Sequence, residues 1–383
     1  MSPPVLSKAP SMISLDNIED FLEKYNQKFM QYFIYLLIGL ILIVYFGYIG
    51  YQTSLNRRNV NYMNTLYSSV DSNILPITSN NSDFSNNLCN YYIKTAYNAC
   101  SGGSYKNDWV DSDNLRAVIK QGVRCLDFEI YSVNNNPVVA TSTTSNNYVK
   151  ETFNYVPFQQ VMSTISTYAF ATGTCPNYTD PILIHLRIKS TNQTMYTNLA
   201  NVFETYDNLM LGSEYSFENS GESIAMLPLL TFQKKIVLIV DKLNTSFLEN
   251  QAFLEYVNLT SNSVFMRALN YEDVKNNPDV VELTNFNKPN MTIVLPDSGT
   301  NPPNPSGILC RHYGCQMVAM RYQYVDSHLE ENALFFDEYG YAFCIKPEEL
   351  RYYPVVIDDP PPQNPAYSYA TRNVTTDYYN YDF

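Results

Sequence analysis

The chain has 383 residues, of which 45% are hydrophobic, and a formal net charge of −13 at pH 7. This acidity argues against nucleic acid as a partner and against attachment to anionic lipid through a basic patch. The seven cysteines form no CxxC pair, which argues against a structural zinc site. Their odd number favours reduced thiols, although Cys89–Cys100 and Cys310–Cys315 bridges remain open.

The first predicted element is a membrane-spanning helix at Tyr32–Tyr51, which carries no charge and no proline. As a helix it would span about 30 Å, the thickness of a bilayer core, with tyrosines at both ends as in an interfacial belt. Residues 1–31 are predicted to be a cytosolic or interfacial amphipathic segment, with a simple extension of the membrane helix as the alternative. Basic residues flank the span on both sides, so its orientation stays open.

The soluble part begins with a polar stretch at residues 52–90, predicted to be a stalk or a wrapping segment. From residue 91 onward, short apolar runs alternate with helical patterns, which indicates βαβ units and a parallel sheet. The number of units favours an α/β fold of the (β/α)8 barrel type over an open sheet. The predicted strands are Tyr92–Tyr97, Cys125–Tyr131, Pro137–Thr141, Ile182–Ile188 and Lys235–Val240, and the predicted helices are Ser112–Gln121, Phe158–Tyr168 and Gln193–Thr205.

The C-terminal third is harder to interpret. Residues 243–290 have a mixed pattern, predicted to be a linker and the start of a second half, and residues 291–353 form a second ordered block. The tail at 354–383 contains DDPPPQNP and several tyrosines. It is predicted to be extended, either as a docking tail or as a solvated end.

Two motifs carry a family resemblance. Residues 121–139 read QGVRCLDFEIYSVNNNPVV, and residues 314–351 begin GCQMVAMRYQYVD and end GYAFCIKPEELR. Both resemble the two half-barrels of the eukaryotic phosphoinositide-specific phospholipases C. The resemblance implies a distorted TIM barrel, with a first half at 91–242, a second half at 291–353 and a linker near 243–270. It leaves no room for EF-hand or C2 modules, so the membrane helix is expected to replace them.

The family reaction implies a general base, a general acid and two histidines, together with a calcium ion held by an asparagine and three carboxylates. Tyr97 and Thr141 stand at the positions that match the two histidines. Asn98, Asp127 and Glu129 keep the types of three calcium ligands, and strand alternation places both carboxylates on the face toward the barrel mouth.

The remaining matching positions depart from the family pattern. Arg187 stands where the third carboxylate is expected, which reverses the charge. Ile239 and Asp241 replace the lysines that grip phosphate, and the substrate-binding stretch matches Met291–Val294, where Thr292 replaces an arginine. The catalytic histidines, one metal ligand and the phosphate-binding cations are therefore absent together.

Arg187 leads to a sharper hypothesis. Asp127 and Glu129 would repel each other without calcium, so the guanidinium of Arg187 could replace the ion and pair with both carboxylates. The alternative is that Arg187 extends to solvent. His185 lies on the same strand face and is predicted to be a buried, hydrogen-bonded core residue rather than a displaced catalytic histidine.

These inferences favour a single-pass membrane protein whose barrel is catalytically inactive and serves as a structural or interaction module, with no cofactor. Composition further suggests a viral or internal membrane, for example that of a virion. The first alternative is an active phosphodiesterase that uses Asn98, Asp127 and Glu129 with calcium. The second is a lipid-binding module without turnover. The expected partners are the bilayer, through Tyr32–Tyr51, and unidentified proteins, with no nucleic acid.

Overall fold

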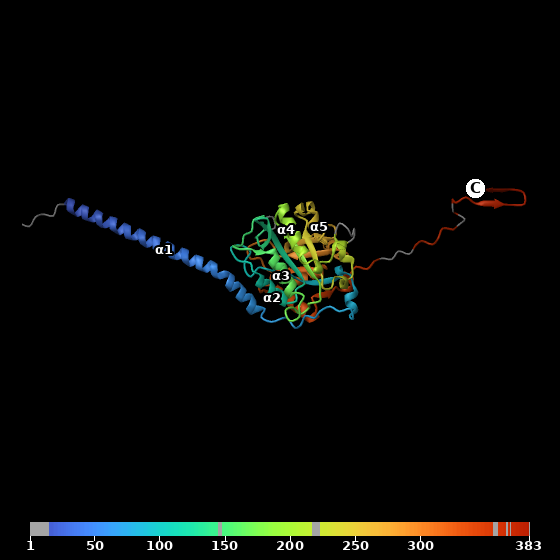
Figure 1. Cartoon of the computed structure of the whole chain (residues 1–383), viewed down its shortest axis with the longest axis horizontal. Helices are drawn as coiled ribbons and strands as arrows, with labels where there is room; N and C mark the ends of the chain where they lie inside the picture. Colours follow the sequence, from blue (N-terminus) through green and yellow to red (C-terminus); the bar gives the residue numbers. More distant parts are fainter. Residues whose placement is uncertain are drawn as a thin grey trace, which may run out of the picture. The chain divides into compact units, whose positions relative to one another are not determined.

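The computed structural model describes residues 15–144, 148–216, 223–354, 359–364, 367 and 369–382. The chain divides into two units, residues 1–351 and residues 352–383. The first unit begins with one long helix, α1 (Leu15–Leu66), drawn unbroken in Figure 1. Part of this helix is long and apolar enough to cross a membrane, with a mean hydropathy of 2.4 and none of that window buried.

Helix α1 differs from the prediction at both ends of the apolar span. Residues 15–31 continue directly into the span as one helix, which is the extension alternative, while residues 1–14 lie outside the described part of the chain. The helix also runs on to Leu66, so the stalk does not begin at residue 52. Residues 52–66 contain no proline or glycine, and the barrel fixes them: Asn56 Nδ2 donates to Asp111 at 3.0 Å, and Met63 is fully buried.

Residues 67–90 wrap around the barrel and end in two 3-10 turns, η1 (Ser82–Ser85) and η2 (Leu88–Asn90). Five apolar side chains of this segment are buried: Ile74, Ile77, Phe84, Leu88 and Cys89. The backbone N–H of Ile77 donates to the Asp180 carboxylate at 2.8 Å. The wrapping alternative therefore describes this segment, since a free stalk would leave these side chains in water.

Eight parallel strands form a nearly closed barrel in the order β7-β6-β5-β2-β1-β10-β9-β8. The predicted barrel fold is confirmed. Every residue of the central strand β5 is buried, as expected for parallel strands that are covered on both faces. The barrel strands are β1 (Tyr91–Ala96), β2 (Cys125–Val133), β5 (Ile182–Ile188), β6 (Ile236–Asp241), β7 (Leu259–Ser261), β8 (Met266–Asn270), β9 (Met291–Leu295) and β10 (Met317–Met320).

Further strands extend this sheet, and helices cover its outside (Figure 1). Strands β3 (Asn136–Ala140), β4 (Val156–Pro157) and β11 (Phe343–Ile345) pair antiparallel with their neighbours. The helices are α2 (Ser112–Lys120), α3 (Phe158–Tyr168), α4 (Gln193–Glu204), α5 (Gln251–Leu254), α6 (Tyr271–Lys275), α7 (Val280–Phe286), α8 (Gly307–His312) and α9 (Ser327–Tyr339). Further 3-10 turns are η3 (Asp207–Leu209), η4 (Ser213–Tyr215), η5 (Ile224–Met226), η6 (Leu229–Phe232), η7 (Thr245–Glu249) and η8 (Glu348–Leu350).

The linker expected near residues 243–270 is not a linker. This region contains barrel strands β7 and β8, which are joined by residues 262–265 alone. Strand β7 has only three residues, and four of the five residues of β8 are half-buried, so neither shows the continuous apolar run of a buried strand. The two half-barrels are therefore contiguous.

The second unit contains a two-stranded hairpin, β12 (Asn373–Thr375) and β13 (Asn380–Asp382). Part of the tail predicted to be extended is thus paired as a hairpin. Residues 355–358, 365, 366, 368 and 383 lie outside the described part. All seven cysteines are free and buried, so neither candidate bridge is formed in the structure.

Lys346 gives a first test of the packing, because its buried Nζ donates to the Asn287 carbonyl at 2.8 Å and forms no ion pair within the described residues. Burial lowers the pKa of Lys346 to about 7. The unfolded chain then binds this proton more tightly, so the group destabilises the fold most below pH 7 and less as the pH rises toward the ordinary lysine value. We expect Lys346→Met to raise the free energy of unfolding by about 1–3 kcal/mol at pH 6.5. Urea unfolding should show this gain shrinking toward pH 10, and a gain that does not vary with pH would contradict the assignment.

Candidate functional site

The candidate site lies where three neighbouring strands present polar side chains to the barrel interior. Strand β1 leads into Tyr97 and Asn98, β2 carries Asp127 and Glu129, and β5 carries Arg187. Strands β2 and β5 are parallel, and their register places Glu129 beside Arg187. Because side chains alternate along a strand, Asp127 and Glu129 share one face, as predicted.

The guanidinium of Arg187 lies between the two carboxylates. Its Nε and Nη2 donate to the two oxygens of Asp127 at 2.9 and 2.7 Å, and its Nη1 donates to Glu129 at 2.8 Å. Nη2 also donates to the Asn98 amide oxygen at 3.0 Å. Arg187 is only 3% exposed, so it does not extend to solvent. The contact that the sequence predicts between Arg187 and both carboxylates is present.

The Asp127 carboxylate has further partners. His185 Nδ1 lies 2.7 Å from one oxygen, and the backbone N–H of Asn98 donates to the other at 3.2 Å. The other ring nitrogen of His185 lies 2.9 Å from Ser261 Oγ, and His185, Asp127 and Ser261 are all fully buried. His185 is therefore the buried, hydrogen-bonded core residue that the sequence predicts.

The second oxygen of Glu129 is held by two residues that the sequence analysis missed. Tyr131 OH donates to it at 2.6 Å, and Ser142 donates through its backbone N–H at 2.9 Å and its hydroxyl at 3.0 Å. Tyr131 could have been found by alternation, since it lies two residues beyond Glu129 on the same strand. Ser142 follows β3 in an irregular segment. Such a segment has no alternation of inward and outward side chains from which Ser142 could have been predicted to point inward.

The electrostatics of the site follow from burial and from this ion pairing. Burial alone would raise the pKa of Asp127, but the Arg187 guanidinium and the hydrogen bonds from His185 and Arg187 hold it well below its usual range. Burial would lower the pKa of Arg187, yet Asp127, Tyr97 and Glu129 raise it further above its ordinary value. Both groups therefore keep fixed charges near neutral pH.

The two positions that match the catalytic histidines hold residues with structural contacts. Tyr97 lies against the Arg187 guanidinium, and the distance from the Tyr97 ring centroid to Arg187 Cζ is 4.6 Å. The Tyr97 ring also packs edge-on against Tyr105. Burial raises the pKa of the Tyr97 phenol far above its usual value, so it stays protonated. Thr141 is buried and donates to the Tyr105 carbonyl at 2.9 Å.

The three positions that match phosphate-binding and substrate-binding residues do not form a cationic cluster. Ile239 is fully buried in β6, and Asp241, at the end of the same strand, accepts from Asn262 Nδ2 at 2.7 Å. Thr292 is the second residue of β9 and donates to Asn287 Oδ1 at 2.5 Å, which places it at the strand end away from the mouth. The structure brings only Asp241 to the mouth side of the barrel.

Loops cover the barrel mouth above this site. The backbone N–H of Tyr105 donates to the Thr300 carbonyl at 3.0 Å, and Gly299 N–H donates to Thr143 at 2.8 Å. Arg321, fully buried after β10, donates to Tyr105 OH at 2.8 Å and also bonds to Pro302 O. The cavity beside Tyr97 and Arg187 measures about 20 Å³, which is room for roughly one water molecule.

Calcium, the ion that the resemblance implies, needs several free oxygen ligands. Arg187 already donates to oxygens of Asn98, Asp127 and Glu129. The remaining buried atom without a partner at this place is Asn98 Nδ2, a donor that no cation can satisfy. The residues present therefore do not fit calcium in this arrangement.

Comparisons with known proteins bear on the fold of the barrel. Residues 84–242 match the family described as phosphatidylinositol-specific phospholipase C, X domain. The crystal structures of S. officinalis PLC21 and L. pealei PLC21 each cover 70% of the chain at 17% identity, with TM-scores of 0.55 and 0.54. The chain spans 38% of the length of each of them, and no curated protein matches it. Residues 84–242 are thus similar to the X domain of the phosphatidylinositol-specific phospholipases C, and the barrel around them has the fold of the two PLC21 structures.

Proposed function

We propose that this protein is a membrane-anchored, catalytically inactive barrel of the phospholipase C kind that serves as a structural or interaction module. The observation that carries the proposal is the position of Arg187, whose guanidinium donates to both carboxylates of the vestigial calcium site. A buried cation fixed by this many hydrogen bonds takes the role of the metal in holding the carboxylates together.

The positions that match the catalytic histidines also hold no group suited to general acid or base catalysis. A general acid or base works best with a pKa near the operating pH. Tyr97 keeps its proton because burial raises its pKa, and the Thr141 hydroxyl is committed to a backbone carbonyl. A cavity of about 20 Å³ also falls far below the ~300–1,000 Å³ of ordinary ligand pockets.

Helix α1 supports the anchoring part of the proposal. None of its apolar stretch is buried, which would be costly in water and is favourable in a bilayer core. The protein has a net charge of −13, so the helix, rather than surface charge, would hold the barrel at a membrane.

The test uses the full chain in nanodiscs that contain phosphatidylinositol and its phosphorylated forms. We expect no inositol phosphate release above that of empty nanodiscs, with an active calcium-dependent phospholipase C as the positive control. Calorimetry on the same sample should show no calcium binding at micromolar to millimolar concentrations. Turnover that depends on calcium would refute the proposal and favour the active phosphodiesterase.

A further inference from the structure

A large apolar groove lies at the opposite end of the barrel from the Arg187 site. Tyr92, near the start of β1, forms part of its floor, whereas Tyr97 and Asn98 follow the other end of that strand. The groove has a volume of about 720 Å³, within the range of pockets that accept whole ligands. It therefore does not depend on the chemistry at the mouth.

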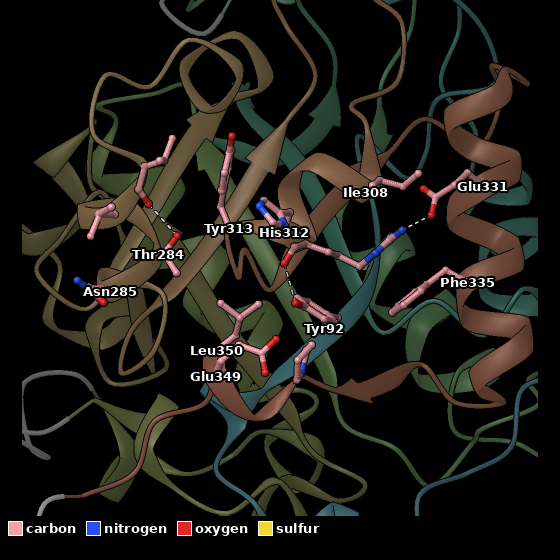
Figure 2. A pocket seen from close by; sticks show the side chains of 14 residues that line it. Tyr92, Thr284, Asn285, Ile308, His312, Tyr313, Glu331, Phe335, Glu349 and Leu350 are labelled. Carbon is pink, nitrogen blue, oxygen red and sulfur yellow. Dashed lines mark hydrogen bonds and ion pairs between the residues drawn. The ribbon is translucent and has the colours of Figure 1, made fainter.

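Three helices and one 3-10 turn form the walls of the groove. Figure 2 shows Ile308, Phe335 and Leu350 around it. Helix α7 contributes Val280 and Val281, α8 contributes Ile308, α9 contributes Phe335, and η8 contributes Leu350. Val281 and Ile308 are 67% and 64% exposed. Several aliphatic side chains around one concave surface are unusual on a soluble face and commonly mark a binding site.

Two polar residues of the groove, Tyr92 and Arg311, have their partners within the protein. Arg311 donates to Asn332 at 3.0 Å, pairs with Glu331 and lies with its Cζ 3.9 Å from the centroid of the Phe335 ring. Tyr92 OH donates to the Arg311 carbonyl at 2.7 Å. The cation of Arg311 is thus neutralised within the protein, and it does not offer an anion site.

Exposed acidic residues lie in the groove and next to it in the sequence. Glu349 lines the groove, whereas Glu348 and Asp279 are the sequence neighbours of the lining residues Glu349 and Val280. All three are exposed, and none forms an ion pair within the part of the chain that the structure describes. An apolar groove with unpaired carboxylates in or next to its lining is complementary to a ligand that is apolar on one face and positively charged on the other.

The shape of the groove favours one of the known modes of peptide binding over the others. Strand addition requires an exposed sheet edge, but β1 is already hydrogen-bonded to β10, β2 and β11. The walls consist of helix side chains with several branched aliphatic residues, which suit the apolar face of a helix laid between them. We propose that this groove binds a basic amphipathic helix of a partner protein. This goes beyond the proposed function, because the groove is independent of whether the barrel mouth is active.

The test uses the full chain in nanodiscs of zwitterionic lipid and a fluorescein-labelled Leu/Lys peptide with Leu at i, i+3, i+4 and i+7 spacing. We expect saturable binding by fluorescence anisotropy after subtraction of empty nanodiscs. Ile308→Asp places a charge in the groove and should weaken binding by about tenfold or more. Leu334→Asp is the matched control, because Leu334 is 60% exposed on α9 but does not line the groove, and it should leave binding unchanged.

Charge gives a second arm to the same experiment. Glu349→Lys should weaken binding of the Leu/Lys peptide by about threefold and reduce the salt dependence of that binding. A Leu/Glu peptide of the same spacing should bind much more weakly than the Leu/Lys peptide. The proposal is overturned by no binding of the Leu/Lys peptide, by equal binding of both peptides, or by equal effects of Ile308→Asp and Leu334→Asp. A proline-rich peptide that binds better than the helical one, in a manner sensitive to Ile308→Asp, would overturn the helix as the occupant.

Discussion

Replacing Arg187 by methionine is expected to lower the free energy of unfolding by about 3–5 kcal/mol at pH 7. The substitution removes the four hydrogen bonds that the guanidinium makes to Asn98, Asp127 and Glu129. It leaves two carboxylates buried side by side with no cation between them, and this desolvated repulsion, rather than the lost pairing itself, supplies most of the cost. Urea unfolding of the full chain in detergent, followed by circular dichroism, measures the change.

Two controls separate this effect from ordinary loss of an arginine. Arg116 pairs with Asp113 at 2.7 Å, but its side chain is 42% exposed, so Arg116→Met should cost no more than about 1 kcal/mol. Adding Asp127→Asn to Arg187→Met removes one of the stranded charges and should recover part of the lost stability. If Arg187→Met and Arg116→Met have similar effects, Arg187 does not hold the carboxylates together.

The Asp127–Arg187 pair also makes the fold sensitive to acid. Because the folded protein holds the pKa of Asp127 below its unfolded value, the pair stabilises the fold above the ordinary carboxyl range. This contribution is lost as the pH falls through the folded value. The acid sensitivity therefore arises at the position that the family resemblance matches to a metal site.

The sequence predicts the first half of the barrel better than the second, for physical reasons. Strand β5 has the predicted bounds because parallel strands buried on both faces appear as continuous apolar runs. Arg187 could be placed against Asp127 and Glu129 because the family resemblance matches it to a calcium ligand, and its charge is opposite to theirs. Strands β7 and β8 were missed because one has three residues and the other is largely half-buried.

Most of the structural features that could not be predicted from the sequence lie in segments without a regular hydrophobic pattern. The loop that carries Gly299 and Thr300 covers the mouth through backbone hydrogen bonds. Almost any sequence can make such bonds, so the pattern of side chains along the sequence does not predict them. Residues 52–66 are polar enough to resemble a stalk, yet they form helix because asparagine side chains such as Asn59 bond to the barrel. Tertiary contacts therefore determine the conformation of both segments.

Arg187→Glu is expected to turn the site into one that requires calcium. The variant would bring a third carboxylate to Asn98, Asp127 and Glu129, which is the set of calcium ligands that the family resemblance implies. Without calcium, three buried carboxylates repel one another, and the variant should be less stable than Arg187→Met. With calcium at about 100 times the dissociation constant, binding should restore about 2.7 kcal/mol, because the ion binds the folded state alone.

Thermal unfolding of the full chain in detergent, with calcium or with chelator, decides between two accounts of the site. Calcium should raise the Tm of Arg187→Glu and leave the Tm of wild type unchanged, while magnesium, which requires a tighter octahedral shell, should do less. Arg187→Gln is the matched control, since it removes the cation without adding a carboxylate and should respond weakly. If calcium leaves Arg187→Glu unchanged, the carboxylates no longer have the geometry of a metal site, and Arg187 completes a structural ion pair that has diverged from any such site. If calcium rescues it, a single charge reversal separates this barrel from metal binding, and the ligand geometry has been kept by the ion pair that replaced the metal.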